Sequence, residues 1–376
     1  MRILIIIRSL ERGGRERQVS LLAPQLRAFG HDVTVLTLYP GGYFEAVIAA
    51  AGVELRSLQK RSRWDLLGPL RYLRATVSES TPDAILGMLV EGNIASVVAR
   101  RWARRSAVAW CIGVADISAR EYGWFSVLLD RLARVLSRRV DCIMYNSQRG
   151  RAVHERHGFP PAKGTLIENA VDAHVFVRNP QLGASLRSEM GIGSEAIVVG
   201  IVARLDAAKD HETFLQAAAL LRRHNSTMQL LVVGADVGER EAGLRSLAEN
   251  LGIDDVVHFL GARDDLPSIY NACTVVVSSS RTEGVSNTLI EAMACGCPIV
   301  ATDAGDSARI VADIALVAQV GDEQALAQCV AVAIERRRER PDWPIELRER
   351  VIRDHSTEAL ANQTISALRT AIAARE

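Results

Sequence analysis

The stretch TVVVSSSRTEGVSNTLIEAMACGCPIVATDAG, residues 274–305, decides the fold of the second half of this chain. It opens with an apolar run at 274–278, passes through a polar turn into a helical pattern at 288–294, and ends in a second apolar run at 298–301. A strand, a helix and a strand in this order predict a βαβ unit whose two strands run parallel. Ligands of such sheets bind at the carboxyl ends of strands, so the turn after residue 278 is the first candidate site.

The same alternation continues outward in both directions. Apolar runs that predict strands lie at 2–7, 33–38, 84–88, 107–111 and 141–146 in the first half, and at 196–203, 228–233, 256–260, 274–278 and 298–301 in the second. The helical patterns between them predict parallel sheets joined by right-handed crossovers. A chain of 376 residues suits two domains of about 150–200 residues. We expect two Rossmann-like doubly wound α/β domains, 1–170 and 171–355, and a final helix, 356–376, that crosses back to the first.

The composition places the chain among soluble globular proteins. Hydrophobic residues make up 48% and charged residues 24%, which argues against disorder or low complexity. No apolar run reaches the roughly 20 residues that span a bilayer, and Arg8 stops the N-terminal run too early for a signal peptide. Six cysteines in a chain of this length are expected to be buried reduced thiols, which suits the cytoplasm.

Charge is distributed unevenly between the two halves. Residues 1–170 hold 25 Lys and Arg against 15 Asp and Glu, whereas residues 171–376 hold 20 against 29. The basic half also carries four of the five tryptophans. Cations beside tryptophan suit an anionic membrane surface or a phosphorylated ligand, although attraction between the two halves would give the same split.

A helix expected over 124–139 is the strongest membrane candidate within that half. One of its faces is apolar and the other carries arginines, so the helix either docks on the domain core or rests on an anionic membrane. Four arginines surround Trp102 nearby: Arg100, Arg101, Arg104 and Arg105. They favour the membrane or a lipid diphosphate as partner, and nothing in the chain points to nucleic acid.

Gly13 and Gly14 follow the first expected strand and precede a helix. Glycines let the backbone approach a phosphate, and a helix N-terminus offers free N–H groups. The pattern is not Gly-x-Gly-x-x-Gly, and no acid ends the second strand, so a bound NAD is not expected. A plain tight turn stays open as the alternative.

Arg204 and Lys209 bracket the turn after the expected strand 196–203. Cations at both ends of a six-residue turn could hold a diphosphate, Arg as a fork of donors and Lys as a point charge. Only three of the 45 cations are lysines, so the choice of Lys at this strand end is notable. A solvated pair on a loop is the alternative.

Glu283 and Glu291 flank the start of the helix expected from residue 288. Ser286 or Asn287 could cap this helix, and Glu291 is expected in its first turn or so. Both carboxylates would then border one cavity and accept sugar hydroxyls, while backbone amides would take phosphate oxygens. A cap and an ordinary surface glutamate stay open. His154 and His157 lie three apart on another expected helix, where a solvated face is favoured over a metal site.

Taken together, these motifs resemble the large retaining glycosyltransferase family 4, which has the GT-B fold. The resemblance rests on Gly13-Gly14 with Glu16, on Arg204 with Lys209, and on Glu283 with Glu291; it covers nearly the whole chain and is strongest over 198–310. It implies a metal-independent retaining transfer of a hexosyl group from a nucleoside-diphosphate sugar, expected to be a UDP-sugar, with no cofactor. The first domain would bind the acceptor and the second the donor.

The resemblance also implies residue roles. Arg204 and Lys209 match the cations on the diphosphate, Glu283 the acid beside the donor sugar, and Glu291 the acid on the ribose hydroxyls. The remaining donor-binding positions are Gly14, Arg263, Gly284, Val285, Ser286 and Asn287. With the basic first domain, we expect a lipid-linked or saccharide acceptor of bacterial surface-polysaccharide assembly. The enzyme would then be cytoplasmic, with peripheral association at the inner face of the membrane.

One departure concerns the acceptor side. Family members often carry a histidine after a middle strand of the first domain, where this chain reads WCIGVAD, residues 110–116, with Asp116 as a weak stand-in. Two alternatives therefore stay open: a nucleotide-sugar epimerase of the same fold, and a catalytically silent protein that binds nucleotide sugar as a scaffold.

Overall fold

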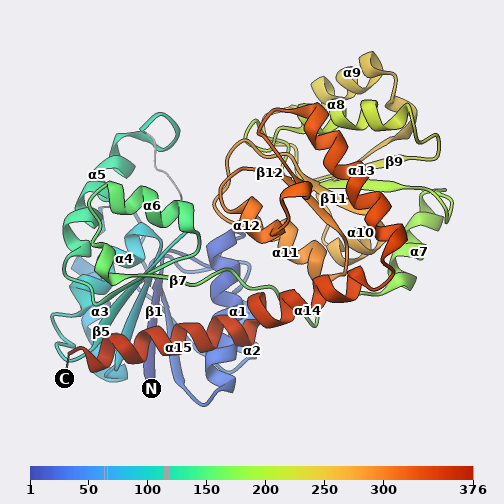
Figure 1. The fold of residues 1–376 in the computed structure, drawn as a ribbon. Coiled ribbons are helices and arrows are strands. Elements are labelled where there is room, and N and C mark those ends of the chain that lie inside the picture. The colour runs from blue at the N-terminus through green and yellow to red at the C-terminus, as the bar shows by residue number, and fades with distance from the viewer. Residues whose placement is uncertain (63, 66, 114–118, 376) are drawn as a thin grey trace. The chain divides into compact units, whose positions relative to one another are not determined.

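The computed structural model describes residues 1–62, 64–65, 67–113 and 119–375, with the backbone alone over 119–127. The chain divides into two compact units, Met1–Ala170 with Thr357–Glu376, and Val171–Ser356. Each unit is built on a parallel sheet with helices packed on it (Figure 1). The expected α/β architecture of two Rossmann-like domains is confirmed.

The sheet of the first unit has seven parallel strands in the order β3-β2-β1-β4-β5-β6-β7. Their bounds are Arg2–Ile7 (β1), Asp32–Thr37 (β2), Glu54–Ser57 (β3), Ala84–Met88 (β4), Ala107–Ile112 (β5), Cys142–Tyr145 (β6) and Gly164–Leu166 (β7). The helices are Gly14–Ala28 (α1), Glu45–Ala50 (α2), Leu67–Ser80 (α3), Leu89–Ala99 (α4), Ala119–Ser137 (α5), Gln148–Arg156 (α6) and Thr357–Ala373 (α15), with a 3-10 turn at Pro161–Lys163. The strand order reverses between β1 and β4, which makes their carboxyl ends a topological switch point.

Helices cover both faces of this sheet, which explains why β1 is a continuous apolar run. Successive side chains of a strand point to opposite faces. Ile3 and Ile5 of β1 pack with residues of α1 and α15, whereas Leu4 and Ile6 pack with residues of α3 on the other face. A strand buried on both faces loses its alternation of apolar and polar residues.

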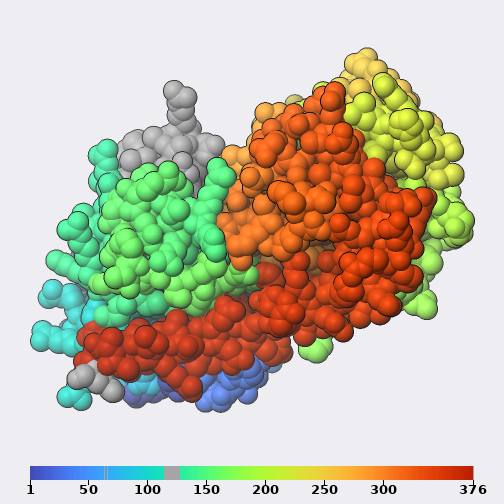
Figure 2. All heavy atoms as spheres, in the orientation of Figure 1, coloured from blue at the N-terminus to red at the C-terminus, as the bar shows by residue number. Residues whose placement is uncertain are grey.

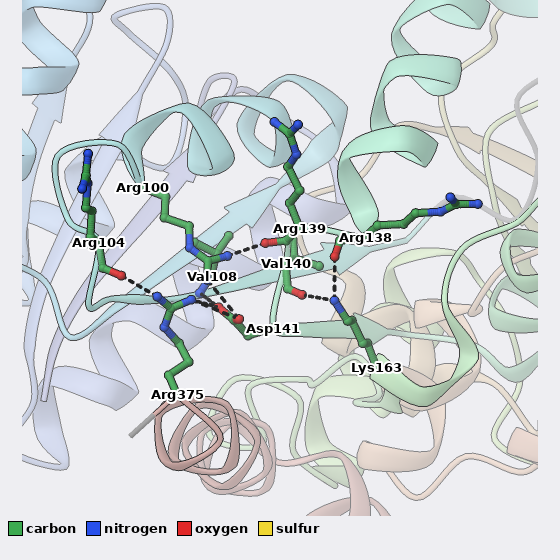
Figure 3. A network of polar contacts seen from close by, with 9 residues as sticks. All are labelled: Arg100, Arg104, Val108, Arg138, Arg139, Val140, Asp141, Lys163 and Arg375. Atoms are coloured by element: carbon green, nitrogen blue, oxygen red, sulfur yellow. Dashed lines mark hydrogen bonds and ion pairs between the residues drawn. The ribbon is translucent and has the colours of Figure 1, made fainter.

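The C-terminal helix α15 belongs to the first unit and lies over it in the space-filling view (Figure 2). It packs on α1 and β5. Just beyond its end, Arg375 contacts both carboxylate oxygens of Asp141 at 3.2 Å, and Arg100 reaches the same carboxylate (Figure 3). Asp141 also accepts a hydrogen bond from the backbone N–H of Val108 at the start of β5, so one half-buried carboxylate ties Arg375 to the sheet.

The second unit has a six-stranded parallel sheet in the order β10-β9-β8-β11-β12-β13. Its strands are Val198–Val202 (β8), Gln229–Val233 (β9), Val257–Gly261 (β10), Val275–Ser278 (β11), Ile299–Thr302 (β12) and Val317–Ala318 (β13). Its helices are Pro180–Glu189 (α7), His211–Arg222 (α8), Glu241–Leu251 (α9), Leu266–Ala272 (α10), Asn287–Ala294 (α11), Ser307–Val311 (α12), Glu323–Glu339 (α13) and Trp343–His355 (α14), with 3-10 turns at Asp254–Val256 and Ile314–Leu316. The order reverses here between β8 and β11.

Sequence patterns missed three strands and misjudged one histidine. β3 and β7 are short and only half-buried, and β13 has two residues, so none shows a strong apolar run. His154 does not lie on a solvated face: it is 6% exposed and stacks edge-on against Phe159. The six cysteines are free and buried, as expected.

Candidate functional site

A small cavity of about 120 Å³ lies at the carboxyl ends of β8 and β11, where the strand order of the second sheet reverses. Its lining includes Arg204, Lys209 and Glu283, which the sequence placed in two separate turns. The cavity is therefore at the position where open α/β sheets bind ligands.

Lys209 and Glu283 form an ion pair inside this cavity. The Lys209 ammonium lies 2.5 Å from Oε1 of Glu283, and the two side chains are 21% and 10% exposed. The Ser280 hydroxyl donates a second hydrogen bond to the same carboxylate oxygen at 2.8 Å. A cation, a carboxylate and a hydroxyl thus converge in a partly desolvated space, where electrostatic interactions are stronger than in water.

Backbone and capping contacts fix the turn that carries Lys209. Its N–H bonds the carbonyl of Asp206, and its carbonyl accepts from the Ser279 hydroxyl at 3.0 Å. Asp210 adopts a left-handed conformation, φ 51°, is fully buried, and caps α8 by accepting from the N–H of Thr213. The Arg281 guanidinium pairs with the Asp210 carboxylate at 3.0 Å, which links the turn to the Glu283 loop.

The Glu283 loop is held from the side of β12. The Thr302 hydroxyl donates to the Ser280 carbonyl at 2.6 Å, and the Asp306 N–H donates to the Gly284 carbonyl. Gly305 has φ 61° and packs so tightly that a Cβ there would lie 2.3 Å from the Glu283 carbonyl oxygen. Both the conformation and the space at position 305 therefore require glycine.

Arg204 and Arg263 present their guanidinium groups near the surface. The Arg204 side chain is 65% exposed and pairs with Asp206 at 3.0 Å while it lines the cavity. Arg263 forks onto Asp265 with two contacts of 2.7 Å, which hold the pKa of that carboxyl below its usual range. Each arginine is thus paired with an aspartate, but only Arg204 also lines the cavity.

Glu291 lies near the start of its helix as expected but differs from the expectation in its surroundings. It is the fifth residue of α11, which begins at Asn287. It is only 4% exposed and its Oε2 accepts from the Tyr270 hydroxyl at 2.8 Å, whereas the lining of the Glu283 cavity does not include it. The two glutamates therefore do not share that cavity.

The remaining candidate residues lie in the loop before α11 or in the first unit. Ser286 is buried, precedes α11 and lines the cavity, but its side chain does not cap the helix. Gly284 and Val285 are half-buried in the loop before it. Gly14 opens α1 in the other unit, where the Glu16 carboxylate folds back against Gly13. Asp116 lies outside the described residues.

Sequence reasoning missed three contributors to the site. Ser280 was visible as part of a serine run at a strand end. Gly305 follows the β12 strand, and in the sequence it looked like any other turn glycine, with no sign that only glycine fits there. Tyr270 lies on α10, so no spacing in the sequence linked it to Glu291. Within the described ranges, no three His, Cys, Asp or Glu side chains form a group that could hold a metal ion.

Two glycosyltransferase family models match this chain, one in each half. The model described as "Glycosyl transferases group 1" matches residues 196–336, and the "Glycosyl transferase 4-like domain" model matches residues 13–170. The chain belongs to the group 1 glycosyltransferases. The family assignment implied by the motifs is thereby confirmed.

Relatives of this group 1 glycosyltransferase match part of it. A D-inositol 3-phosphate glycosyltransferase of Stackebrandtia nassauensis is 35% identical over 41% of this chain and 36% of its own length. One of Corynebacterium urealyticum is 38% identical over 43% and 40%. The matched region thus spans little more than a third of these relatives. The Anabaena protein HepE, solved in complex with UDP, has a TM-score of 0.84 at 22% identity, covering 98% of this chain and all of that one, and it shares the fold.

Proposed function

We propose that this chain transfers a hexosyl group from a UDP-sugar to a hydroxyl acceptor, with retention at the anomeric carbon. The observation that carries the proposal is the Lys209–Glu283 pair in the cavity at the β8/β11 switch point. Family membership supports transfer chemistry. The complexes of HepE with UDP and with UDP-glucose support UDP as the nucleotide.

In this reaction, the bond between the anomeric carbon and the diphosphate oxygen breaks and an acceptor oxygen bonds the same face of the sugar. The acceptor proton passes to the leaving diphosphate oxygen, and UDP departs. Lys209 and the exposed guanidinium of Arg204 would stabilise the charge that develops on the diphosphate, a role that needs no metal ion. Glu283 would bind sugar hydroxyls next to that charge.

The other candidates take supporting roles in the proposal. The backbone of Gly284, Val285, Ser286 and Asn287 would contact phosphate and sugar. Glu291 would accept the ribose hydroxyls. Because it is buried on Tyr270, this role requires local opening or a shift of the helix that carries it. Arg263 would act through the backbone of its turn, since its guanidinium is held by Asp265.

Thermal shift with UDP, UDP-GlcNAc, UDP-glucose, GDP-mannose and NADH tests the donor. A ligand at 100 times its Kd adds about 2.7 kcal/mol to the free energy of unfolding. We expect stabilisation by one nucleotide sugar and none by NADH. A flat response to every sugar would falsify the proposal. Conversion of the donor without any acceptor would favour the epimerase. Binding without turnover in any acceptor panel would favour the scaffold.

We further propose a lipid-linked acceptor of bacterial surface glycan assembly at the inner face of the membrane, with the first unit on the lipid. Leu128, Leu132 and Val135 of α5 are 52%, 43% and 65% exposed, one or two turns apart on one stripe. Exposed arginines accompany this stripe at 131, 138 and 139. Such a helix suits the headgroup boundary of an anionic bilayer. Among the helices of the described residues, none combines the length and the apolar character that a membrane span requires.

The arginines of this basic region do not all point to the surface that is proposed to meet the membrane. Arg100 turns inward to Asp141, whereas the side chains of Arg104, Arg138 and Arg139 point away from that network (Figure 3). Flotation with vesicles containing phosphatidylglycerol tests the surface. We expect retention at low salt, loss at high salt, and loss in Leu132→Ser with Val135→Ser. Failure of the parent protein to float at low salt would remove the membrane proposal and leave the donor chemistry intact.

A further inference from the structure

A second cavity, of about 50 Å³, lies in the first unit beside the carboxyl ends of β4 and β5, next to the switch point between β1 and β4. Its lining brings together Arg15 from the start of α1, Asn93 from α4 and Asp130 from α5. Leu89, which starts α4 and also lines the cavity, has φ 61°, a strained conformation that concentrates at functional sites.

Two buried polar atoms lie among these residues without a partner. Within the described part of the chain, neither Nη2 of Arg15 nor Oδ1 of Asn93 has a hydrogen-bond partner. A buried charge without a partner costs far more than a buried neutral group, so native proteins pair such charges. One unpaired guanidinium nitrogen at a switch point is therefore the mark of a site that awaits a ligand.

The absence of a side chain at Gly113 leaves room for the Arg15 guanidinium. A Cβ at Gly113, the residue after β5, would lie 1.8 Å from Nε of Arg15, so the group rests directly on the glycine backbone. Burial lowers the pKa of Arg15, and the Cys111 sulfur and the Glu16 carboxylate offset this only in part. Glu16 instead folds back on Gly13, and Asp130 makes no ion pair with Arg15 in the described part.

We propose that Arg15 binds an anionic group of the acceptor, a phosphoryl or carboxylate oxyanion, at the carboxyl edge of the N-terminal sheet. This inference rests on the proposed transfer function and adds the substrate class to it. The guanidinium fork matches such an oxyanion with two donors. Asn93 and Asp130 would accept hydroxyls of the same molecule. The acceptor would thus be a polyhydroxylated anion, either a soluble sugar phosphate or the headgroup of a lipid-linked sugar.

Calorimetric titration of the full chain tests the site. Saturating UDP fills the donor site first, and the probes are then inorganic phosphate, glucose 6-phosphate, glucose and farnesyl phosphate. We expect binding of the phosphorylated probes and none of glucose, with affinity at least tenfold weaker in Arg15→Gln. Arg27→Gln is the matched control: it removes the same charge at the exposed other end of α1, and its affinity should stay unchanged.

A second variant and a melting temperature separate a loss of anion binding from a loss of folded structure. Gly113→Ala keeps the charge but displaces the guanidinium, and we expect it to weaken phosphate binding as well. Arg15→Gln should melt at the same temperature as the parent or higher, because it removes a half-buried guanidinium whose Nη2 is buried without a partner. Equal affinity of parent and Arg15→Gln for every probe overturns the proposal, as does a lower melting temperature of Arg15→Gln with binding unchanged.

The outcomes also separate this inference from the transfer proposal. Tighter binding of glucose 6-phosphate indicates a soluble acceptor, and tighter binding of farnesyl phosphate a lipid-linked one. If no nucleotide sugar binds, the transfer function fails, while comparison of parent and Arg15→Gln still decides the anion site. If a nucleotide sugar binds and turns over but Arg15→Gln weakens the binding of no anion, only the present inference fails.

Discussion

The Tyr270 hydroxyl donates a hydrogen bond to Oε2 of Glu291 at 2.8 Å, and both residues are buried, at 0% and 4% exposure. Burial and the adjacent carboxylate raise the pKa of Tyr270 well above its usual range, so this phenol stays a donor at any physiological pH. A tyrosine on α10 therefore fixes the acid on α11 that is proposed to bind ribose.

Tyr270→Phe should lower both stability and donor affinity. Removing one donor to a buried carboxylate costs about 1–3 kcal/mol in the free energy of unfolding. Urea denaturation measures this loss, and titration with UDP measures the affinity. Tyr72→Phe, at a side chain that is 55% exposed, is the control and should change neither. Unchanged stability in Tyr270→Phe would mean that the hydrogen bond has little net value.

Lys209→Met should abolish most transfer while the protein stays folded. Removing one preorganised donor to developing charge typically costs about 100- to 1000-fold in kcat. Glu283 keeps its bond from Ser280, so the loss of stability should be modest. A double-mutant cycle with Glu283→Gln measures the pair directly, with coupling of about 0.5–3 kcal/mol expected for residues in contact. Additive effects on turnover would show that the two side chains act independently.

Arg204→Ala should separate binding from stability. This side chain is 65% exposed and its ion pair with Asp206 is a surface one, worth about 0–1 kcal/mol. We therefore expect a melting temperature within about 1–2 °C of the parent. Affinity for UDP should fall at least tenfold, whereas affinity for uridine, which lacks the diphosphate, should not change. Equal losses for UDP and uridine would place Arg204 away from the diphosphate.

Gly305→Ala compared with Gly321→Ala isolates the effect of contact at the Glu283 loop. Both glycines have positive φ, 61° and 77°, so alanine costs about 1–2 kcal/mol of conformational strain at each. Only at position 305 would the new Cβ collide with the Glu283 carbonyl; at 321 nothing lies within 4 Å. We expect Gly305→Ala to lose clearly more stability and to bind UDP-glucose more weakly. Similar behaviour of the two variants would show that the loop yields easily.

The fold was readable from the sequence wherever a strand is buried on both faces. β1 and β4 have the expected bounds, since each is a continuous apolar run, whereas the half-buried β3 carries one apolar residue among four and escaped detection. The family motifs likewise located Lys209 and Glu283, because each follows a strand at the sheet edge where ligands bind.

Contacts between distant segments could not be read in this way. Tyr270 reaches Glu291 across two helices, and Ser280 shares Glu283 with Lys209, 74 residues earlier. Glu291 was expected beside Glu283 because both flank one helix start. The helix begins within one residue of the expected start, but it turns Glu291 toward α10. Spacing predicts which residues share a helix face, but the partner of that face depends on packing.

His211 should make the second unit sensitive to acid. It begins α8 after the Lys209 turn, is 1% exposed, and its Nε2 has no hydrogen-bond partner within the described residues. Burial lowers its pKa below the usual value of about 6.5, against the opposing charges of Glu212 and Asp206. Between its folded and unfolded pKa values, the histidine binds a proton only in the unfolded chain. The free energy of unfolding therefore falls as the pH drops below about 6.5, by up to about 1.4 kcal/mol per pH unit.

Urea denaturation at pH 7.5 and at pH 5.5 tests this. The free energy of unfolding should differ less between the two pH values in His211→Gln than in the parent, whereas His157→Gln, at an exposed position, should match the parent. His31 and His258 also have lowered pKa values but are present in all three proteins, so the comparison assigns the difference to His211. An identical pH dependence in His211→Gln and the parent would show that other groups govern the acid response.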